Sequence, residues 1–291
     1  MNTSECYISV VVISFNGREF IDDCLSTTCE SLAGVDAEII VVDNGSADGT
    51  LDIIRDKYPN VSLIPNDTNL GFARAVNQGL TRSRGEFILL LNQDTRIRDR
   101  AIIKLAERMK RDDRIGTIGP KFVGFDGRLQ FSARAFPRFR DLLYAYTGLS
   151  RVFPRSKIFN RWKMGWFDHE TEMAVEQPMG SALLIRRQVV DRVGLFDERF
   201  EIFFNDVDYC RRVVESGYSN LYYPDAVVEH FHGGSVKKMR PRMVYVWHRA
   251  MYRYLRKYNR GLIHRPLLYF WGAVLFVSAL VRSLYYRFSR N

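Results

Sequence analysis

Four clusters of small polar side chains lie in the first hundred residues, and each follows a short apolar segment. The clusters are Ser14, Asn16 and Gly17; Asp43, Asn44, Gly45 and Ser46; Asn66 and Asp67; and Asn92, Gln93 and Asp94. A carboxylate with neighbouring amides can bind the base and ribose of a nucleoside, and a lone aspartate can bind a divalent metal that carries a diphosphate. Each cluster alone is also typical of a turn or a helix cap, whereas the four together favour a binding rim.

The elements that must position these clusters form a regular alternation. Apolar, β-branched segments at 8–15, 37–42, 61–64 and 86–91 predict strands, and helix-like spacing predicts helices at 18–32, 48–58 and 71–83. Strands that are apolar on both faces and joined by helices indicate a parallel sheet with helices on both faces. The carboxyl ends of such strands meet at one edge, where ligands bind.

The sequence lacks the two common glycine-rich phosphate loops. No G-x-G-x-x-G follows the first predicted strand, and no G-x-x-x-x-G-K-[ST] occurs in the chain. Dinucleotide and P-loop modes of phosphate binding are therefore disfavoured. The four cysteines form no C-x-x-C pair, so neither a disulfide framework nor a structural zinc site is expected.

Eight segments, in order along residues 8 to about 235, resemble the family-2 glycosyltransferases and most closely their rhamnosyltransferase-like branch. The segments are VVISFN (11–16), VVDNGSADGT (41–50), NLGFARAVN (69–77), LLLNQDT (89–95), GSALLIRR (180–187), FDERF (196–200), NDVDYCRR (205–212) and PDAVVEH (224–230). These are inverting enzymes that use nucleotide sugars. The resemblance implies the GT-A fold, a mostly parallel central sheet with helices on both faces, here followed by a C-terminal helical tail.

The resemblance also implies a role for individual residues. It places the nucleotide sugar against Ser14, Asn16, Asp43, Asn69, Gly71, Asn77 and Asn92. It makes Asp94 the last position of the D-x-D metal motif, with His230 helping to hold Mn²⁺ or Mg²⁺. It makes Asp206 the catalytic base and puts Gly180 and Ser181 on the acceptor side.

Two departures from the family pattern bear on this site. Asn92 and Gln93 leave Asp94 as the only carboxylate of the metal motif, and Asn205 replaces the usual Glu before the base. Asp206 is also a plausible N-cap of a helix that begins near residue 207, and His232 is a rival to His230 as a ligand. A non-catalytic nucleotide- or glycan-binding module with a degenerate metal motif is therefore the alternative to an enzyme.

The positive charge of the chain is concentrated near its C-terminus. The formal net charge is +10, yet thirteen of the 43 Lys and Arg residues follow Glu229, the last acidic residue. We therefore expect a GT-A domain at 1–235, with a nucleotide-binding half (1–98) and an acceptor half (99–235), and a basic tail at 236–291. Such a tail suits an anionic membrane surface or nucleic acid.

An uncharged segment within the tail separates these two partners. Residues 267–281 would form roughly 22 Å of helix, shorter than the roughly 30 Å hydrocarbon core of a bilayer. We expect this helix to lie in the cytoplasmic leaflet, which makes the protein cytoplasmic, peripheral to the inner face of the cell membrane, and not a nucleic-acid binder. The alternative is a buried C-terminal helix. Deleting residues 262–291 is expected to release the protein from membranes and to leave donor hydrolysis intact.

Basic and aromatic residues alternate between positions 131 and 166. This pattern suits an acceptor groove, in which arginines meet a lipid pyrophosphate and aromatic rings stack on sugars. Arg186 and Arg187 are expected to face solvent. The resemblance to the rhamnosyltransferase-like branch implies transfer of a sugar to a saccharide or lipid-linked saccharide acceptor in cell-surface polysaccharide synthesis. By that branch alone, L-rhamnose from a dTDP donor is the leading candidate.

Overall fold

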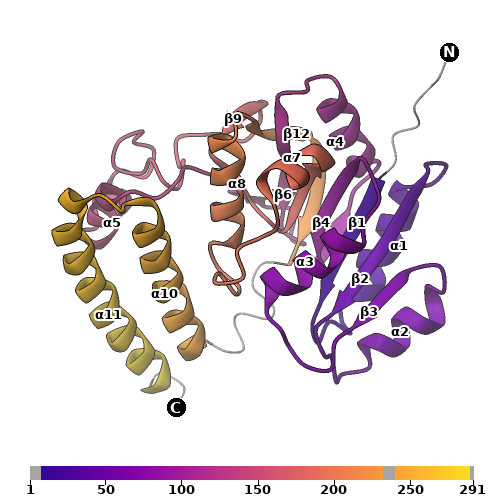
Figure 1. Cartoon of the computed structure of the whole chain (residues 1–291), viewed down its shortest axis with the longest axis horizontal. Coiled ribbons are helices and arrows are strands. Elements are labelled where there is room, and N and C mark those ends of the chain that lie inside the picture. The colour runs from indigo at the N-terminus through magenta and orange to yellow at the C-terminus, as the bar shows by residue number, and fades with distance from the viewer. Residues whose placement is uncertain (1–7, 232–239, 289–291) are drawn as a thin grey trace.

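The computed structural model describes residues 8–231 and 240–288 (Figure 1). The expected boundary between residues 235 and 236 lies outside the described residues, and so does His232.

The first hundred residues form the expected alternation of strands and helices. They contain β1 (Ile8–Ser14), α1 (Ile21–Ser31), β2 (Ala37–Asp43), α2 (Thr50–Lys57), β3 (Ser62–Pro65), α3 (Phe72–Arg82) and β4 (Phe87–Asn92). The four strands are parallel, in the spatial order β3-β2-β1-β4. Ser14 pairs with Asp43, and Ile13 pairs with Asn92, so the polar clusters after β1, β2 and β4 meet at one edge of the sheet, as predicted.

The second half of the domain extends the same sheet. It adds β5 (Thr95–Ile97), α4 (Ala101–Lys110), β6 (Ile115–Val123), β11 (Ala182–Arg186), α7 (Arg187–Val193), α8 (Asn205–Glu215) and β12 (Ser219–His230). Beyond β4 the order continues β11-β6-β12-β5, with β11 antiparallel to both of its neighbours. The sheet is therefore mixed, and mostly parallel in its first half.

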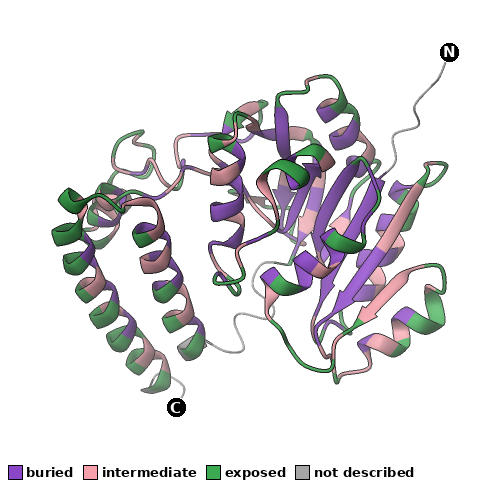
Figure 2. Cartoon of the chain, viewed as in Figure 1, coloured by how far each residue is buried: buried purple, intermediate pink, exposed green. Residues whose placement is uncertain are grey.

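Helices cover both faces of this sheet. Residues of α1, α2 and α4 pack on one face, and residues of α3, α7 and α8 pack on the other. Figure 2 shows the central strands buried between these layers, whereas β3 and the start of β2 are only partly buried. The strands are rich in Val, Ile and Leu because both of their faces are enclosed.

Short elements connect β6 to β11. They are β7 (Leu129–Gln130), β8 (Ala133–Arg134), α5 (Phe139–Tyr146), α6 (Leu149–Val152), β9 (Met173–Val175) and β10 (Gln177–Pro178). Several aromatic residues of this segment do not line an open groove. Phe136, Phe139 and Trp162 instead pack into a core cluster shared with the C-terminal helices. These three residues of the predicted acceptor pattern therefore help to hold the C-terminal helices on the domain.

The C-terminal segment is a helical hairpin packed on α8. Helix α10 (Arg240–Tyr258), the 3-10 turn η1 (Leu262–His264) and α11 (Arg265–Phe288) follow one another, and α11 lies outermost in Figure 1. At 24 residues α11 is about 36 Å long, longer than the segment expected from residues 267–281. By length and composition, the helical stretch Leu262–Arg287 is the one candidate membrane span among the described residues.

The two sides of α11 have different environments. Leu268, Trp271 and Leu275 pack against α10 in the shared core cluster. The opposite side carries exposed apolar residues, which we call the outer face: Tyr269, Phe270, Phe276, Val277, Leu280, Val281, Leu284 and Tyr285. The structure thus combines both expectations, a packed helix and an unburied apolar surface.

Candidate active site

Strand pairing brings Asp94 and His230 together, although 135 positions separate them in the chain. Asp94 lies between β4 and β5, and the pairing of β5 with β12 sets His230 opposite Thr95. Asp94 Oδ1 is 3.6 Å from His230 Nε2, and the Phe231 amide donates to the Asp94 carbonyl at 2.8 Å. The other ring nitrogen, Nδ1, lies 3.1 Å from Gln130 Oε1, so Gln130 orients the ring.

The geometry of this pair fits a divalent cation. Ligand atoms that each lie about 2.0–2.2 Å from one ion can be up to about 4 Å apart, so 3.6 Å is compatible with joint coordination. Among residues 8–231 and 240–288, no group of three or more His, Cys, Asp and Glu could hold a metal. The protein would therefore supply a carboxylate and an imidazole, and a diphosphate and water would complete the shell. Burial raises the pKa of Asp94 to about 6.

Asp206 lies in the first turn of α8 and is not its N-cap. The cap is Phe204, whose φ of 67° is left-handed, and Asn205 donates its side-chain amide to the Ile202 carbonyl at 2.6 Å. The Asp206 carboxylate accepts hydrogen bonds from three donors. The Val207 amide is 2.8 Å from Oδ1, and Gln177 Nε2 and the Gly180 amide are 2.8 and 3.1 Å from Oδ2.

The surroundings of Asp206 suit a proton acceptor. Burial raises the pKa of its carboxyl above the ordinary value, and the three donors oppose that rise because they stabilise the charged form. A carboxyl group with a raised pKa is a stronger base when ionised. The residue retains partial exposure, so a substrate can reach it.

A turn connects Asp206 to the end of β4. Gly180 packs so closely on Asp206 that a Cβ atom on Gly180 would lie 2.8 Å from the Asp206 Cβ. The next residue, Ser181, accepts the Asn92 amide at 2.9 Å, and the Asn92 Nδ2 is 3.3 Å from the Ser181 Oγ. Asp94 follows two residues later, so Asp206 and Asp94 lie at the same edge of the sheet.

Asn92 has an unused acceptor at this edge. Its Oδ1 is buried and has no hydrogen-bond partner among the described residues. A buried acceptor without a donor carries a free-energy cost, which a ligand hydroxyl or a metal-bound water would remove.

Ser14, Asn16 and Asp43 gather on the far side of the same edge. The Asp43 carboxylate is buried and accepts the Ser46 amide at 2.8 Å and the Ser46 hydroxyl at 2.6 Å. Ser46 Oγ also accepts the Asn16 amide at 2.8 Å, and Asn16 Oδ1 accepts the Ala47 amide at 3.0 Å. These contacts join the loops after β1 and β2 into one preformed wall.

Asn69, Gly71 and Asn77 are close in sequence but lie in different environments. Asn69 Oδ1 accepts the Gly71 amide at 2.9 Å, and Gly71 takes a φ of 89° where a side chain would be strained. Both polar ends of Asn77 are used within the protein, because it donates to the Phe196 carbonyl and accepts the Phe196 amide. Asn77 therefore positions the loop before α8, and nothing in its geometry supports direct contact with a donor.

Glu201 links this region to the C-terminal hairpin. Its carbonyl accepts the Phe72 amide of α3 at 2.8 Å, and its carboxylate pairs with Arg249 of α10 at 2.6 Å. The loop that leads into α8 therefore contacts α3 on one side and α10 on the other.

Comparison with known sequences assigns the family. A family model described as glycosyl transferase family 2 matches residues 9–170. An N-acetylglucosaminyl-diphospho-decaprenol L-rhamnosyltransferase of Mycobacterium tuberculosis is 31% identical over 245 residues, which cover 79% of this chain and 78% of that protein. The chain belongs to glycosyltransferase family 2.

Solved structures assign the fold of this glycosyltransferase. A mannosyltransferase from Pyrobaculum calidifontis, in complex with GDP-Man and Mn²⁺, superposes with a TM-score of 0.60 at 18% identity, covering 97% of this chain and 74% of that one. GalNAc-T7 with UDP, GalNAc and Mn²⁺ also gives 0.60, at 14% identity, covering 88% of this chain and 48% of that one. The expected GT-A fold of this family 2 enzyme is confirmed.

Three glutamines support the candidate site of this glycosyltransferase, and sequence reasoning missed two of them. Gln177 donates to Asp206, Gln130 orients His230, and Gln93 Oε1 accepts the Ser14 hydroxyl at 2.8 Å. Gln177 and Gln130 lie in the irregular segment before β11, where no periodic pattern marks them. Gln93 was expected in the polar cluster after the fourth strand, but its contact with Ser14 was not.

The expectation that Arg186 and Arg187 face solvent is wrong. Arg186 is buried, and its guanidinium donates to the carbonyls of Met109 and Ile115. Arg187 donates to the Gly85 carbonyl at 3.0 Å. Both arginines tie β11 to neighbouring loops, because a guanidinium group can satisfy several carbonyls at once.

Proposed function

We propose that this glycosyltransferase moves a sugar with inversion from a nucleotide-sugar donor to a saccharide acceptor, lipid-linked, in the synthesis of cell-surface polysaccharide. The proposed donor is dTDP-L-rhamnose. The named activity of the mycobacterial relative, an L-rhamnosyltransferase acting on a diphospho-decaprenol lipid, supports this choice of donor and acceptor class.

One observation carries the catalytic part of the proposal. The Asp206 carboxylate is held by the Gly180 turn, and that turn is hydrogen-bonded to Asn92 at the end of the strand that leads to Asp94. A proton acceptor and a cation-binding pair at one edge are what a direct displacement at an anomeric carbon requires.

The residues divide the chemical step between them. Asp206 would take the proton of the acceptor hydroxyl as that oxygen attacks, and Oδ1 would receive it because Oδ1 accepts one hydrogen bond whereas Oδ2 accepts two. A cation held by Asp94 and His230 would neutralise charge on the departing nucleoside diphosphate. The wall of Ser14, Asn16 and Asp43 would hold the nucleoside, and the orphaned Asn92 Oδ1 would accept a sugar hydroxyl or a metal-bound water.

The C-terminal hairpin supports association with a membrane surface on the cytoplasmic side. The outer face of α11 offers apolar side chains to a bilayer, while its other side packs on α10. Helix α10 runs beside α11 and carries Arg249, Arg253, Arg256 and Lys257. If α11 spanned the bilayer in this arrangement, it would carry these charges into hydrocarbon, so we propose that it lies along the surface.

A donor screen with a catalytic variant tests the proposal. A panel of nucleotide sugars that includes dTDP-L-rhamnose is incubated with Mn²⁺, and release of nucleoside diphosphate is measured. Asp206→Asn is expected to lower kcat by about 10²–10⁴-fold and to leave nucleotide affinity unchanged, because the residue acts on the acceptor proton. Asp206→Glu, which keeps the charge but moves it, should retain part of the activity.

The same screen separates the enzyme from the alternative binding module. If nucleotides bind but no nucleotide sugar is turned over, the protein is the non-catalytic binding module. If transfer occurs from another nucleotide sugar and not from dTDP-L-rhamnose, only the proposed donor is wrong.

A further inference from the structure

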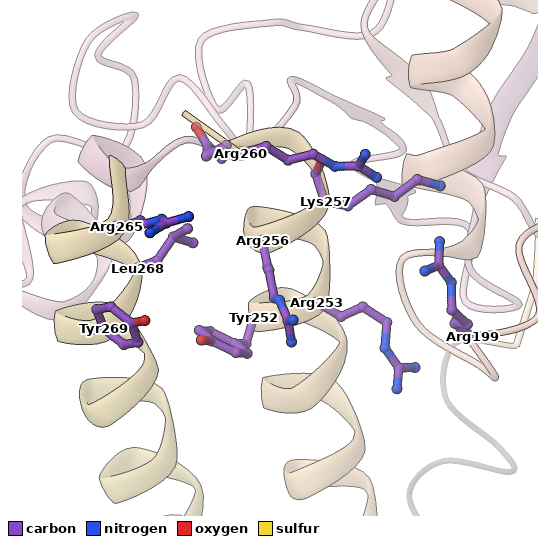
Figure 3. Close-up of a pocket in the computed structure, with 10 residues that line it drawn as sticks. Arg199, Tyr252, Arg253, Arg256, Lys257, Arg260, Arg265, Leu268 and Tyr269 are labelled. Atoms are coloured by element: carbon purple, nitrogen blue, oxygen red, sulfur yellow. The ribbon is translucent and has the colours of Figure 1, made fainter. Parts of the chain in front are cut away.

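A basic pocket is lined by both helices of the hairpin and by Arg199 of the loop before α8, and its lining includes neither Asp206 nor Asp94. It has a volume of about 930 Å³, and six of its lining side chains are cationic (Figure 3). These are Arg199, Arg253, Arg256, Lys257, Arg260 and Arg265. Among the residues that the structure describes, no acidic one lines the pocket.

Four of these six cations lack a counter-charge in the part of the chain that the structure describes, and one of the four, Arg260, donates only to the Lys257 carbonyl. Lys257 and Arg199 are paired with acidic residues outside the pocket, since both contact Asp197. Arg253, Arg256 and Arg265 have no hydrogen-bond or ion-pair partner among residues 8–231 and 240–288. The sequence after Glu229 contains no acidic residue, so the hairpin cannot neutralise them itself.

The pocket opens beside the apolar surface of α11. Tyr269 belongs both to the pocket lining and to the outer face, and Leu268 and Tyr252 also line the pocket. Figure 3 shows Arg265, Leu268 and Tyr269 on one helix and Arg253 and Arg256 on the other, with Arg253 extending toward Arg199. Charged and apolar binding surfaces therefore adjoin, which is the pattern that an amphiphile requires.

Arginine is well matched to a phosphate group. Its planar guanidinium donates several N–H groups in a fixed arrangement and binds phosphate oxygens in pairs. A terminal phosphate or diphosphate offers more free oxygens and more charge than a phosphodiester, so several arginines lining one pocket favour the terminal group.

We propose that this pocket binds the terminal phosphate or diphosphate of a lipid whose hydrocarbon chain lies along the outer face of α11. The site is an anion-binding position separate from the proposed cation pair of Asp94 and His230, and it is independent of whether the enzyme turns over any donor. It gives the hairpin a specific lipid ligand in addition to general attraction to an anionic surface.

Isothermal titration calorimetry with farnesyl diphosphate, without nucleotide or metal, tests the proposal. The triple variant Arg253→Gln, Arg256→Gln, Arg265→Gln removes three charges inside the pocket. Its control, Arg242→Gln, Arg282→Gln, Arg287→Gln, removes three exposed charges elsewhere on the hairpin. We expect the pocket variant to bind at least tenfold more weakly than the wild type, and the control to bind within about twofold of it.

Three comparison ligands identify which chemical group the pocket binds. Inorganic pyrophosphate and farnesol should each bind at least tenfold more weakly than farnesyl diphosphate, and phosphatidylglycerol vesicles should not distinguish the two triple variants. Equal weakening in both variants would mean that the attraction is diffuse and the site does not exist. Pyrophosphate binding as tightly as farnesyl diphosphate would mean that the ligand is a free phosphate compound. Vesicle binding lost only in the pocket variant would mean that a phosphodiester suffices.

Folding of the variants is checked by circular dichroism. If the pocket triple variant does not fold, the single variants Arg256→Gln and Arg265→Gln replace it, each compared with Arg282→Gln, since all three side chains are exposed. Each pocket variant is expected to bind farnesyl diphosphate at least threefold more weakly than Arg282→Gln does. The proposal would be overturned if both single variants bound farnesyl diphosphate as tightly as the wild type.

Discussion

The carboxyl group of Asp206 experiences two opposing influences. Burial favours its protonated form, while the amides of Val207 and Gly180 and the side chain of Gln177 favour the charged form. The balance leaves its pKa raised. An ionised base is needed for transfer, so activity should fall as the pH decreases through this raised pKa.

Replacing Gln177 by Met should shift the pH at which activity falls on the acid side. The variant keeps the side-chain volume but removes the donor to Asp206 Oδ2, so the pKa of Asp206 rises further. The acid limb of kcat/KM is expected to move to higher pH by about one unit, equivalent to roughly 1.4 kcal/mol. A pH–rate profile measures it. If kcat/KM fell equally at every pH and the pH of its acid-side decline did not move, Gln177 would have only a structural role.

In the proposed site, Gln130 would act on a bound cation through His230. It holds Nδ1 of the ring, so Gln130→Leu should leave both ligands present but poorly oriented. The expected result is a 10–100-fold weaker affinity for Mn²⁺ in the presence of dTDP, with kcat at saturating Mn²⁺ little changed. Titration calorimetry measures the affinity. Unchanged Mn²⁺ affinity would show that the ring is oriented by its strand alone.

At the residue scale, sequence reasoning succeeded where a residue follows a strand. Asp43, Asn92 and Asp94 lie at the predicted edge because strand ends are set by periodicity and turn residues. The sequence did not predict the contacts of Asn77 or of the supporting Gln177. Their partners, Phe196 and Asp206, lie far along the chain, and only the folded structure shows which polar groups meet.

Helix α10 is attached to α8 by buried charges. Lys257 contacts the carboxylates of Asp208 and Asp197, and Asp208 is completely buried. Hydrogen bonds from Arg199 and Lys257 hold the pKa of Asp197 well below its usual range. The hairpin is therefore fastened to the helix that carries Asp206, and to the loop before it.

Removing this attachment should destabilise the whole domain. Lys257→Met is expected to lower the free energy of unfolding by about 3 kcal/mol, because Asp208 keeps only Arg212 and Tyr258 as partners. The exposed Arg282→Met should change it by no more than about 0.5 kcal/mol. Urea denaturation compares the two. Equal stabilities would mean that Lys257 contributes only to the pocket.

At the element scale, the first four strands were predicted to within one residue at each end. Apolar segments enclosed on both faces leave a strong signal in the sequence. The antiparallel β11 and the short pairs around β7 to β10 left no such signal, because two or three residues cannot show a period. The length of α11 was underestimated because its first and last turns contain arginines.

The hairpin is a part of the packed molecule and not a detachable tail. Deleting residues 262–291, as first expected, would also remove Leu268, Trp271 and Leu275 from the core shared with α10. The truncated protein would then fail for reasons unrelated to membranes. Substitutions confined to the outer face separate the two effects.

The outer-face variant Phe270→Ser, Phe276→Ser, Val277→Ser, Val281→Ser should lose membrane association and remain folded. Each apolar side chain buried in a bilayer contributes about 1.5–3 kcal/mol, so partition into anionic vesicles should fall at least a hundredfold. Vesicle sedimentation measures it. The inner-face Leu275→Ser should instead lower the thermal midpoint, because Leu275 is almost fully buried. Undiminished sedimentation of the outer-face variant would refute a surface-bound α11.

The pairing of β5 with β12 has a consequence for the whole molecule. Because that pairing sets His230 beside Asp94 without any ion, we expect folding to complete the proposed cation site before an ion arrives. Chelation with EDTA should therefore stop sugar transfer while shifting the melting temperature by less than about 2 °C, and added Mn²⁺ should restore the rate at once, without a refolding lag. A chain that melts when stripped of its ion would show instead that the ion helps to build the strand pair.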